Sequence, residues 1–184
     1  LGEIQHGHMD QVGYDTYCRL LDEVVKEIQG IEVKEEQDIQ IDIDVSSYIP
    51  DSFIDNNSQK IEIYQNIALC RTEEDIQNVI DEIIDRYGHM PSELENLIEI
   101  ARIKNLCRVD NVIKISQRKE KVVFYFDKAK FNPEIVDKLI KKYNTNIRFS
   151  TGIEPYVTVT IGSKIIEEIK EFLTYIQNCT TSSM

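Results

Sequence analysis

A stretch of strictly alternating residues between Ile39 and Ser46 constrains the fold more than any other part of the sequence. Isoleucine or valine occupies every second position, and glutamine, aspartate or serine occupies the positions between them. Because successive side chains of a strand point to opposite faces, this pattern predicts a strand with one buried and one wet face. Pro50 ends the ladder because it has no N–H group to donate, and Asp51 and Ser52 are typical turn residues.

A segment of three consecutive helices is expected after this turn. Thr72 starts the clearest of them, because it is an N-cap residue followed by acidic residues that suit the positive end of a helix. Gly88 ends this helix, and Ser92, with Glu95 at capping-box spacing, starts the next one. The predicted buried stripe of the Thr72 helix consists of Ile76, Val79, Ile80, Ile83, Ile84 and Tyr87.

The spacing of apolar residues changes in the second half of the chain. The new pattern predicts a small, mostly antiparallel sheet with two helices. A hairpin is expected from residues 112–116 and 121–127, and two further strands from residues 146–150 and 156–161. The predicted buried stripe of the helix between these pairs consists of Ile135, Val136, Leu139, Ile140 and Tyr143. A last helix is expected over residues 163–176, and a separate N-terminal helix over residues 14–29. Without regular βαβ alternation, the fold class is α+β.

Charge and composition divide the chain unevenly. The net charge is −12, but residues 31–100 carry 18 acidic and 4 basic residues, whereas residues 101–184 carry 15 basic and 9 acidic ones. We expect an N-terminal helix and linker over residues 1–38, one α+β domain over 39–177 and a disordered tail over 178–184. The opening residues lack an initiator Met and a signal peptide, so we expect a cytoplasmic piece of a longer protein.

Motifs for catalysis, cofactors or metals are absent from the sequence. It has no glycine-rich phosphate loop and no nucleophile elbow. His6 and His8 are two histidines in a start without periodicity, which is too few ligands for a metal site. The four cysteines lie far apart, without a C-x-x-C pair, and are expected to be free thiols. We therefore expect no enzyme activity, no cofactor and no metal in this chain by itself.

The acidic side of the Thr72 helix has two interpretations. Glu82 and Asp85 are three residues apart, so both carboxylates lie on one face of the helix. A partner's arginines would relieve their repulsion by bidentate pairing. The simpler interpretation is a solvated face that serves solubility. The residue pattern alone leaves both open.

Several motifs resemble the C-terminal part of bacterial transcription-repair coupling factors, the Mfd family. Near the start, Gln5, Gly7 and His8 resemble the family's translocation motif. The segments 48–54 and 81–88, Y-I-P-D-S-F-I and D-E-I-I-D-R-Y-G, resemble the start of the C-terminal domain and its signature helix. Further matches are Lys60, Tyr64 and Ile67, then Pro91 and the run Ile100-Ala101-Arg102-Ile103-Lys104. The resemblance weakens in the C-terminal half.

This resemblance implies a non-catalytic regulatory domain at the end of an ATP-dependent DNA translocase. Such a domain docks on the N-terminal UvrB-like domain of the same protein, masks the UvrA-binding surface and represses the motor. ATP, Mg²⁺, RNA polymerase and double-stranded DNA would be bound by upstream parts of the parent. Asp81, Glu82 and Asp85, on the matched signature helix, are the expected contacts to basic residues of the UvrB-like domain. The resemblance therefore favours the interface interpretation of the acidic helix.

Two alternatives remain. A nucleic-acid-binding module would use the basic residues Lys128, Lys130, Lys138, Lys141 and Lys142 against phosphate. The overall net charge of −12 speaks against this possibility. A small-molecule regulatory domain is the third option, and a ligand-induced rise in melting temperature would reveal it.

Overall fold

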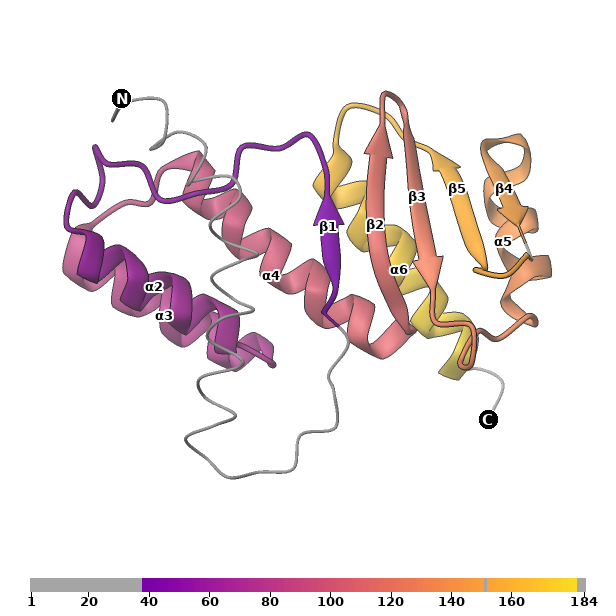
Figure 1. The fold of residues 1–184 in the computed structure, drawn as a ribbon, viewed down its shortest axis with the longest axis horizontal. Coiled ribbons are helices and arrows are strands. Elements are labelled where there is room, and N and C mark those ends of the chain that lie inside the picture. Colours follow the sequence, from indigo (N-terminus) through magenta and orange to yellow (C-terminus); the bar gives the residue numbers. More distant parts are fainter. Residues whose placement is uncertain (1–37, 151, 182–184) are drawn as a thin grey trace. The chain divides into compact units, whose positions relative to one another are not determined.

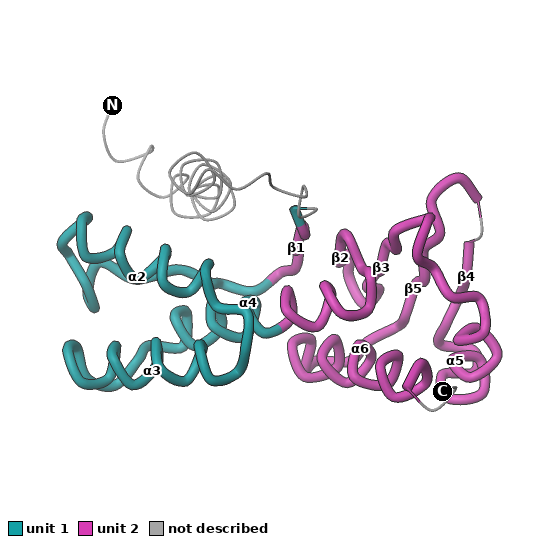
Figure 2. The backbone as a smooth tube through the Cα atoms, turned by 90° about the horizontal axis from the view of Figure 1, so that it is seen from below, with its two compact units in different colours: residues 1–38, 45–102 teal, residues 39–44, 103–184 magenta. Residues whose placement is uncertain are grey.

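The computed structural model describes residues 38–150 and 152–181. In this part of the chain, residues 45–102 belong to one compact unit, unit 1, and residues 39–44 and 103–181 to a second, unit 2 (Figure 2). The helix expected over residues 14–29, the linker and the boundary at residue 38 lie outside or at the limit of the described residues, so they stay predictions.

Unit 1 contains the three helices that the sequence predicts. They are α2 (Asn57–Leu69), α3 (Glu73–Tyr87) and the first part of α4 (Ser92–Asp110). The Thr72 hydroxyl accepts from the Asp75 N–H, and the Asp75 carboxylate accepts from the Thr72 N–H, which completes a capping box. Gly88 ends α3 with a φ of 88°, a conformation that favours glycine. The predicted start and end of this helix are confirmed.

Two predicted details of these helices are wrong. Ile84 is 48% exposed, because it lies at the edge of an apolar arc too wide for one helix to bury completely. Ser92 does not form a capping box with Glu95: its hydroxyl donates to the neighbouring Glu93 carboxylate. The carbonyl of Pro91 instead accepts from the N–H groups of residues 94 and 95 and starts the helical bonding of α4.

The core of unit 1 joins the three helices to the segment before α2. Its buried residues are Ile49, Ile54, Ile63, Ile67, Cys70, Ile76, Ile83, Leu94, Leu97, Ile98 and Ala101. The Tyr64 hydroxyl accepts from the Ile49 N–H at 2.9 Å, and the Lys60 ammonium pairs with the Asp51 carboxylate. The K-x-x-x-Y-x-x-I run of α2 therefore holds the turn around Pro50 in place.

Unit 2 contains one five-stranded sheet in the order β1-β2-β3-β5-β4 (Figure 1). Its strands are β1 (Gln40–Asp42), β2 (Val112–Arg118), β3 (Lys121–Phe126), β4 (Ile147–Ser150) and β5 (Tyr156–Thr160). β1 and β2 are parallel, and the other three neighbouring pairs are antiparallel. The predicted hairpin, the mostly antiparallel sheet and the α+β class are confirmed.

The alternating stretch behaves as predicted in burial, although its hydrogen-bonded strand is short. Ile39 is buried, whereas Gln40, Asp42 and Asp44 are exposed. The ladder with β2 covers only three residue pairs. Beyond it, the Asp44 N–H donates to the side-chain oxygen of Gln117 at 2.8 Å instead of to a strand carbonyl. The alternation of buried and exposed side chains therefore extends beyond the residues that are hydrogen-bonded to β2.

Two helices, α5 (Ile135–Tyr143) and α6 (Ile165–Thr181), cover one face of this sheet, and the 3-10 turn η1 (Asn144–Asn146) follows α5 (Figure 2). Ile135 and Leu139 are buried, but Ile140 is 46% exposed, so this member of the predicted stripe is wrong. The core also takes Ile103 and Cys107 from the second part of α4.

The tail expected to be disordered from residue 178 is helical through Thr181, which corrects the prediction for residues 178–181. Cys179 is 7% exposed and belongs to the core. The Lys138 ammonium donates to the Cys179 carbonyl at 2.7 Å. This bond satisfies a helix C-terminus and places a cation at its negative end.

Candidate interaction surface on helix α3

The start of α3 is held by two sets of polar contacts. The Asp75 carboxylate accepts from the N–H groups of Arg71 and Thr72, at 2.9 and 2.8 Å. These backbone hydrogen bonds lower the pKa of the Asp75 carboxyl below its usual value. Carboxylates in the first turn are also favoured by the positive end of the helix. The helix that carries the predicted interface therefore has a well-defined start.

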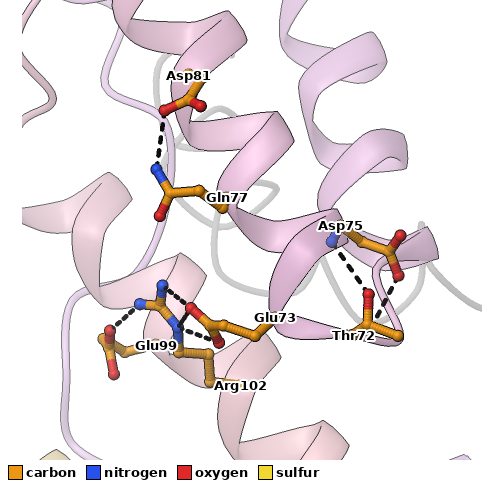
Figure 3. Close-up of polar contacts among 7 residues, drawn as sticks. All are labelled: Thr72, Glu73, Asp75, Gln77, Asp81, Glu99 and Arg102. Atoms are coloured by element: carbon orange, nitrogen blue, oxygen red, sulfur yellow. Dashed lines mark hydrogen bonds and ion pairs between the residues drawn. The ribbon is translucent and has the colours of Figure 1, made fainter.

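Arg102 of α4 binds the first residue of α3 (Figure 3). Its Nε lies 3.0 Å from each carboxylate oxygen of Glu73, and its Nη2 lies 2.6 Å from Oε1. Its Nη1 also donates to Glu99 on the same helix. The Arg102 side chain is 21% exposed, so these contacts are partly shielded from water. They join α3 to α4.

We expect a double-mutant cycle to find coupling between Arg102 and Glu73. Replacing either residue, in Arg102→Met or Glu73→Gln, should lower the free energy of unfolding, because a forked, charge-assisted pair is lost. The coupling should be about 0.5–1 kcal/mol, since Glu73 is 66% exposed and water screens the pair. Urea unfolding of the four proteins measures it. Strictly additive changes would show that the pair contributes nothing to stability.

At the other end of α3, Glu82 takes part in contacts inside unit 1. Arg86 Nη1 lies 2.8 Å from the Glu82 carboxylate and 3.2 Å from that of Glu62 on α2. Glu82 is 39% exposed in its side chain. These hydrogen bonds, first to Glu82 and then to Glu62, raise the pKa of Arg86. Of the predicted interface residues, Glu82 is thus the one already paired with a basic partner.

Asp81 and Asp85 lie on the exposed side of α3, one helical turn apart. Asp81 accepts from the Gln77 side chain at 2.8 Å (Figure 3). Within the described residues, the Asp85 carboxylate has neither a hydrogen bond nor an ion pair. The exposed Ile84 lies beside them on the helix surface. We call Asp81, Ile84 and Asp85 the α3 surface: it offers two carboxylates and one apolar side chain.

The sequence identified the two aspartates but missed Ile84. Ile84 lies at the margin of the predicted apolar stripe of α3. A narrower stripe would have excluded it from the core and predicted that it is exposed. Gln5, Gly7 and His8, the predicted remnant of the translocation motif, lie outside the described residues.

Metal and thiol chemistry receive no support from the part of the chain that the structure describes. It holds no group of three or more histidine, cysteine, aspartate or glutamate side chains placed to bind a metal ion. Cys70, Cys107 and Cys179 are buried and are not joined in disulfides. Burial raises the pKa of the Cys107 thiol far above its usual value, which disfavours the reactive thiolate. No helix among the described residues is long and apolar enough to cross a bilayer.

Three of the five lysines proposed for nucleic-acid binding are engaged within unit 2. Lys138 donates to the end of α6. Lys142 lies 2.9 Å from the Glu171 carboxylate and 4.3 Å from the centre of the Tyr175 ring. Lys130 lies 3.9 Å from Asp127. The α5 region is therefore a weak candidate for contacting phosphates.

Comparison with known proteins agrees with the resemblance. The family model described as the TRCF domain matches residues 43–135. The transcription-repair-coupling factor of Bacillus subtilis is 38% identical over 123 residues, which are 66% of this chain and 10% of that protein. The one from Staphylococcus epidermidis is 41% identical over 106 residues, 56% of this chain and 9% of that protein.

A solved structure shares the fold. The crystal structure of the C-terminal domain of a transcription-repair coupling factor has a TM-score of 0.68, with 21% sequence identity, over 79% of this chain and 96% of that one. The matched part of the chain spans about a tenth of the curated relatives. The family match covers more than half of the sequence and includes the α3 surface. The chain therefore belongs to the TRCF domain family of transcription-repair coupling factors.

Proposed function

We propose that the chain is a non-catalytic regulatory module of a cytoplasmic, ATP-dependent DNA translocase that couples transcription to nucleotide excision repair. In this proposal it docks on the N-terminal UvrB-like domain of the same protein and masks the surface that binds UvrA. ATP and Mg²⁺ would be bound by upstream parts of the parent, as would RNA polymerase and double-stranded DNA. The observation that supports the proposal is the α3 surface, where Asp81 and Asp85 are exposed beside Ile84.

The chemistry of this surface suits a contact that must open. Exposed carboxylates attract arginines of a partner, but water and salt screen each pair to roughly 0.2–1 kcal/mol. Ile84 adds a small apolar area that would be buried on docking. Such a contact is weak between separate molecules, yet it holds within one chain, because tethering supplies a high effective concentration. Binding of RNA polymerase to the parent would then suffice to release it.

Charge reversal on the α3 surface tests this function. We expect Asp81→Arg/Asp85→Arg in the full-length parent to raise UvrA binding and the basal ATPase rate several-fold, because the masking contact is lost. The matched control is Glu95→Arg/Asp55→Arg, which makes the same change of charge at exposed positions of unit 1. Wild-type UvrA binding and ATPase rates in the α3 variant would refute the proposed contact.

A further inference from the structure

One face of the unit 2 sheet is not covered by α5 and α6, and the strand register shows which residues lie on it. Paired residues on neighbouring strands point to the same side of a sheet. Ile115, Phe124 and Val157 are paired in one such row and belong to the core on the helical side. The rows on the opposite side are therefore Lys114–Tyr125–Tyr156, Ser116–Val123–Thr158 with Arg148, and Arg118–Lys121–Thr160. Figure 2 shows the helices of unit 2 on one side of the sheet only.

Two tyrosines lie next to each other on this open face. The ring centres of Tyr125 on β3 and Tyr156 on β5 are 5.6 Å apart, with the planes tilted by 48°. Tyr156 is 37% exposed, although it is a large aromatic residue. The ammonium of Lys114 lies 5.6 Å from the centre of the Tyr125 ring. Exposed aromatic rings on a sheet surface are what unpaired bases stack on.

Further cations lie on the same face of the sheet as the tyrosine pair. Arg118, Lys121 and Arg148 are exposed, and within the described residues their side chains form no hydrogen bond or ion pair. Lys121 is four residues from Tyr125 on the same strand, about 13 Å at the rise of an extended chain. The acidic residue that shares these rows is Asp42, on the edge strand β1. The face thus has a positive charge of its own in a chain whose net charge is −12.

From this arrangement we infer that the open face of the unit 2 sheet binds single-stranded nucleic acid, with Tyr125 and Tyr156 as the stacking pair. The cations of the site would be Lys114, Arg118, Lys121 and Arg148 on the same face. Unpaired bases would stack on the two rings while the cations contact the phosphates between them. A duplex cannot offer its bases for such stacking, because they are already paired and stacked. The surface is distinct from the α5 lysines and from the α3 surface.

Fluorescence anisotropy of the 184-residue chain with labelled oligonucleotides tests the inference. The probes are a twelve-nucleotide oligothymidine, an oligouridine of the same length and a duplex, each at about 50 and 200 mM NaCl. We expect salt-sensitive binding of the single strands and weaker binding of the duplex. Whichever single strand binds more tightly shows whether DNA or RNA is the preferred source of the unpaired bases. No binding of either single strand at the lower salt concentration would overturn the inference.

Two variants and one control locate the site. Tyr156→Ser should weaken single-strand binding about tenfold, since stacking on one aromatic side chain is lost. Arg118→Glu/Lys121→Glu should weaken single-strand binding more than Tyr156→Ser does, and should reduce the salt dependence of binding. The matched control, Lys128→Glu/Lys141→Glu, makes the same change of charge at exposed positions outside the strands. It should bind at least fivefold more tightly than the Arg118→Glu/Lys121→Glu variant. Circular dichroism of each variant confirms that the chain is folded.

Three results would contradict the inference. Equal binding of duplex and single strands, with no effect of Tyr156→Ser, would indicate nonspecific attraction of charges. Loss of binding in the Lys128→Glu/Lys141→Glu control alone would assign the site to the α5 region instead. Wild-type affinity in the Arg118→Glu/Lys121→Glu variant would show that the phosphates lie elsewhere.

Discussion

Asp110→Asn is expected to stabilise unit 2 at alkaline pH and to remove much of the pH dependence of its stability. Asp110 is the last residue of α4 and is 8% exposed. Its Oδ2 atom is buried without a hydrogen-bond partner among the described residues. Burial raises the pKa of this carboxyl to about 8. The negative end of α4 also disfavours a charged carboxylate at this position.

The sign of the effect follows from proton linkage. The folded state holds the Asp110 proton up to a pH of about 8, whereas an unfolded aspartate releases it near pH 4. The stability contributed by the protonated carboxyl is therefore complete below pH 4 and is lost as the pH rises through 8. Between these values the free energy of unfolding should fall by up to about 1.4 kcal/mol per pH unit from this group.

The asparagine cannot ionise, so the variant should escape this loss. Allowing for the cost of burying an amide, we expect Asp110→Asn to exceed the wild type by ~2–4 kcal/mol at pH 9 and to show no advantage at pH 5. Urea unfolding at the two pH values measures the difference. The control is Asp137→Asn, because Asp137 is an exposed carboxylate of the same unit. A wild type whose stability does not fall between pH 5 and 9 would disprove the expectation.

The pair of Lys60 and Asp51 should respond asymmetrically to the loss of each partner. The Lys60 side chain is 8% exposed, whereas that of Asp51 is 79% exposed. Asp51→Ala would leave a buried ammonium without this carboxylate, which we expect to cost roughly 2–4 kcal/mol of unfolding free energy. Lys60→Met keeps the apolar stem and leaves Asp51 in water, so its cost should stay below about 1 kcal/mol.

Thermal and urea unfolding of both variants measure this asymmetry. Asp55→Ala removes a neighbouring exposed carboxylate from the same segment and serves as the control. If Asp51→Ala lowers the free energy of unfolding no more than Lys60→Met does, the Lys60 ammonium is solvated in the folded state. A cost for Asp55→Ala as large as that for Asp51→Ala would mean that the effect comes from the net charge and not from the pair.

Local patterns were sufficient for several elements. The alternation from Ile39 onwards identified a half-buried strand, and Thr72 and Gly88 defined α3 to within a residue. These signals depend on neighbours within about four positions, so no tertiary information is needed. Helix α4 was harder, because its buried face changes along its length. Its first part contributes Leu94 and Leu97 to the core of unit 1, and its second part contributes Ile103 and Cys107 to that of unit 2. No single period of 3.6 residues describes such a helix.

The sequence by itself determined the α+β class, the family and the acidic face of α3, because each follows from the order of residues along the chain. Only the tertiary structure decided which acidic residues of α3 are available. Arg86 pairs with Glu82 and with Glu62 of α2, while Asp81 and Asp85 stay exposed. The tertiary structure also makes Tyr125 and Tyr156 neighbours, although they are thirty-one positions apart in the sequence. Contacts between elements depend on strand order and register, and these are set by packing over the whole unit.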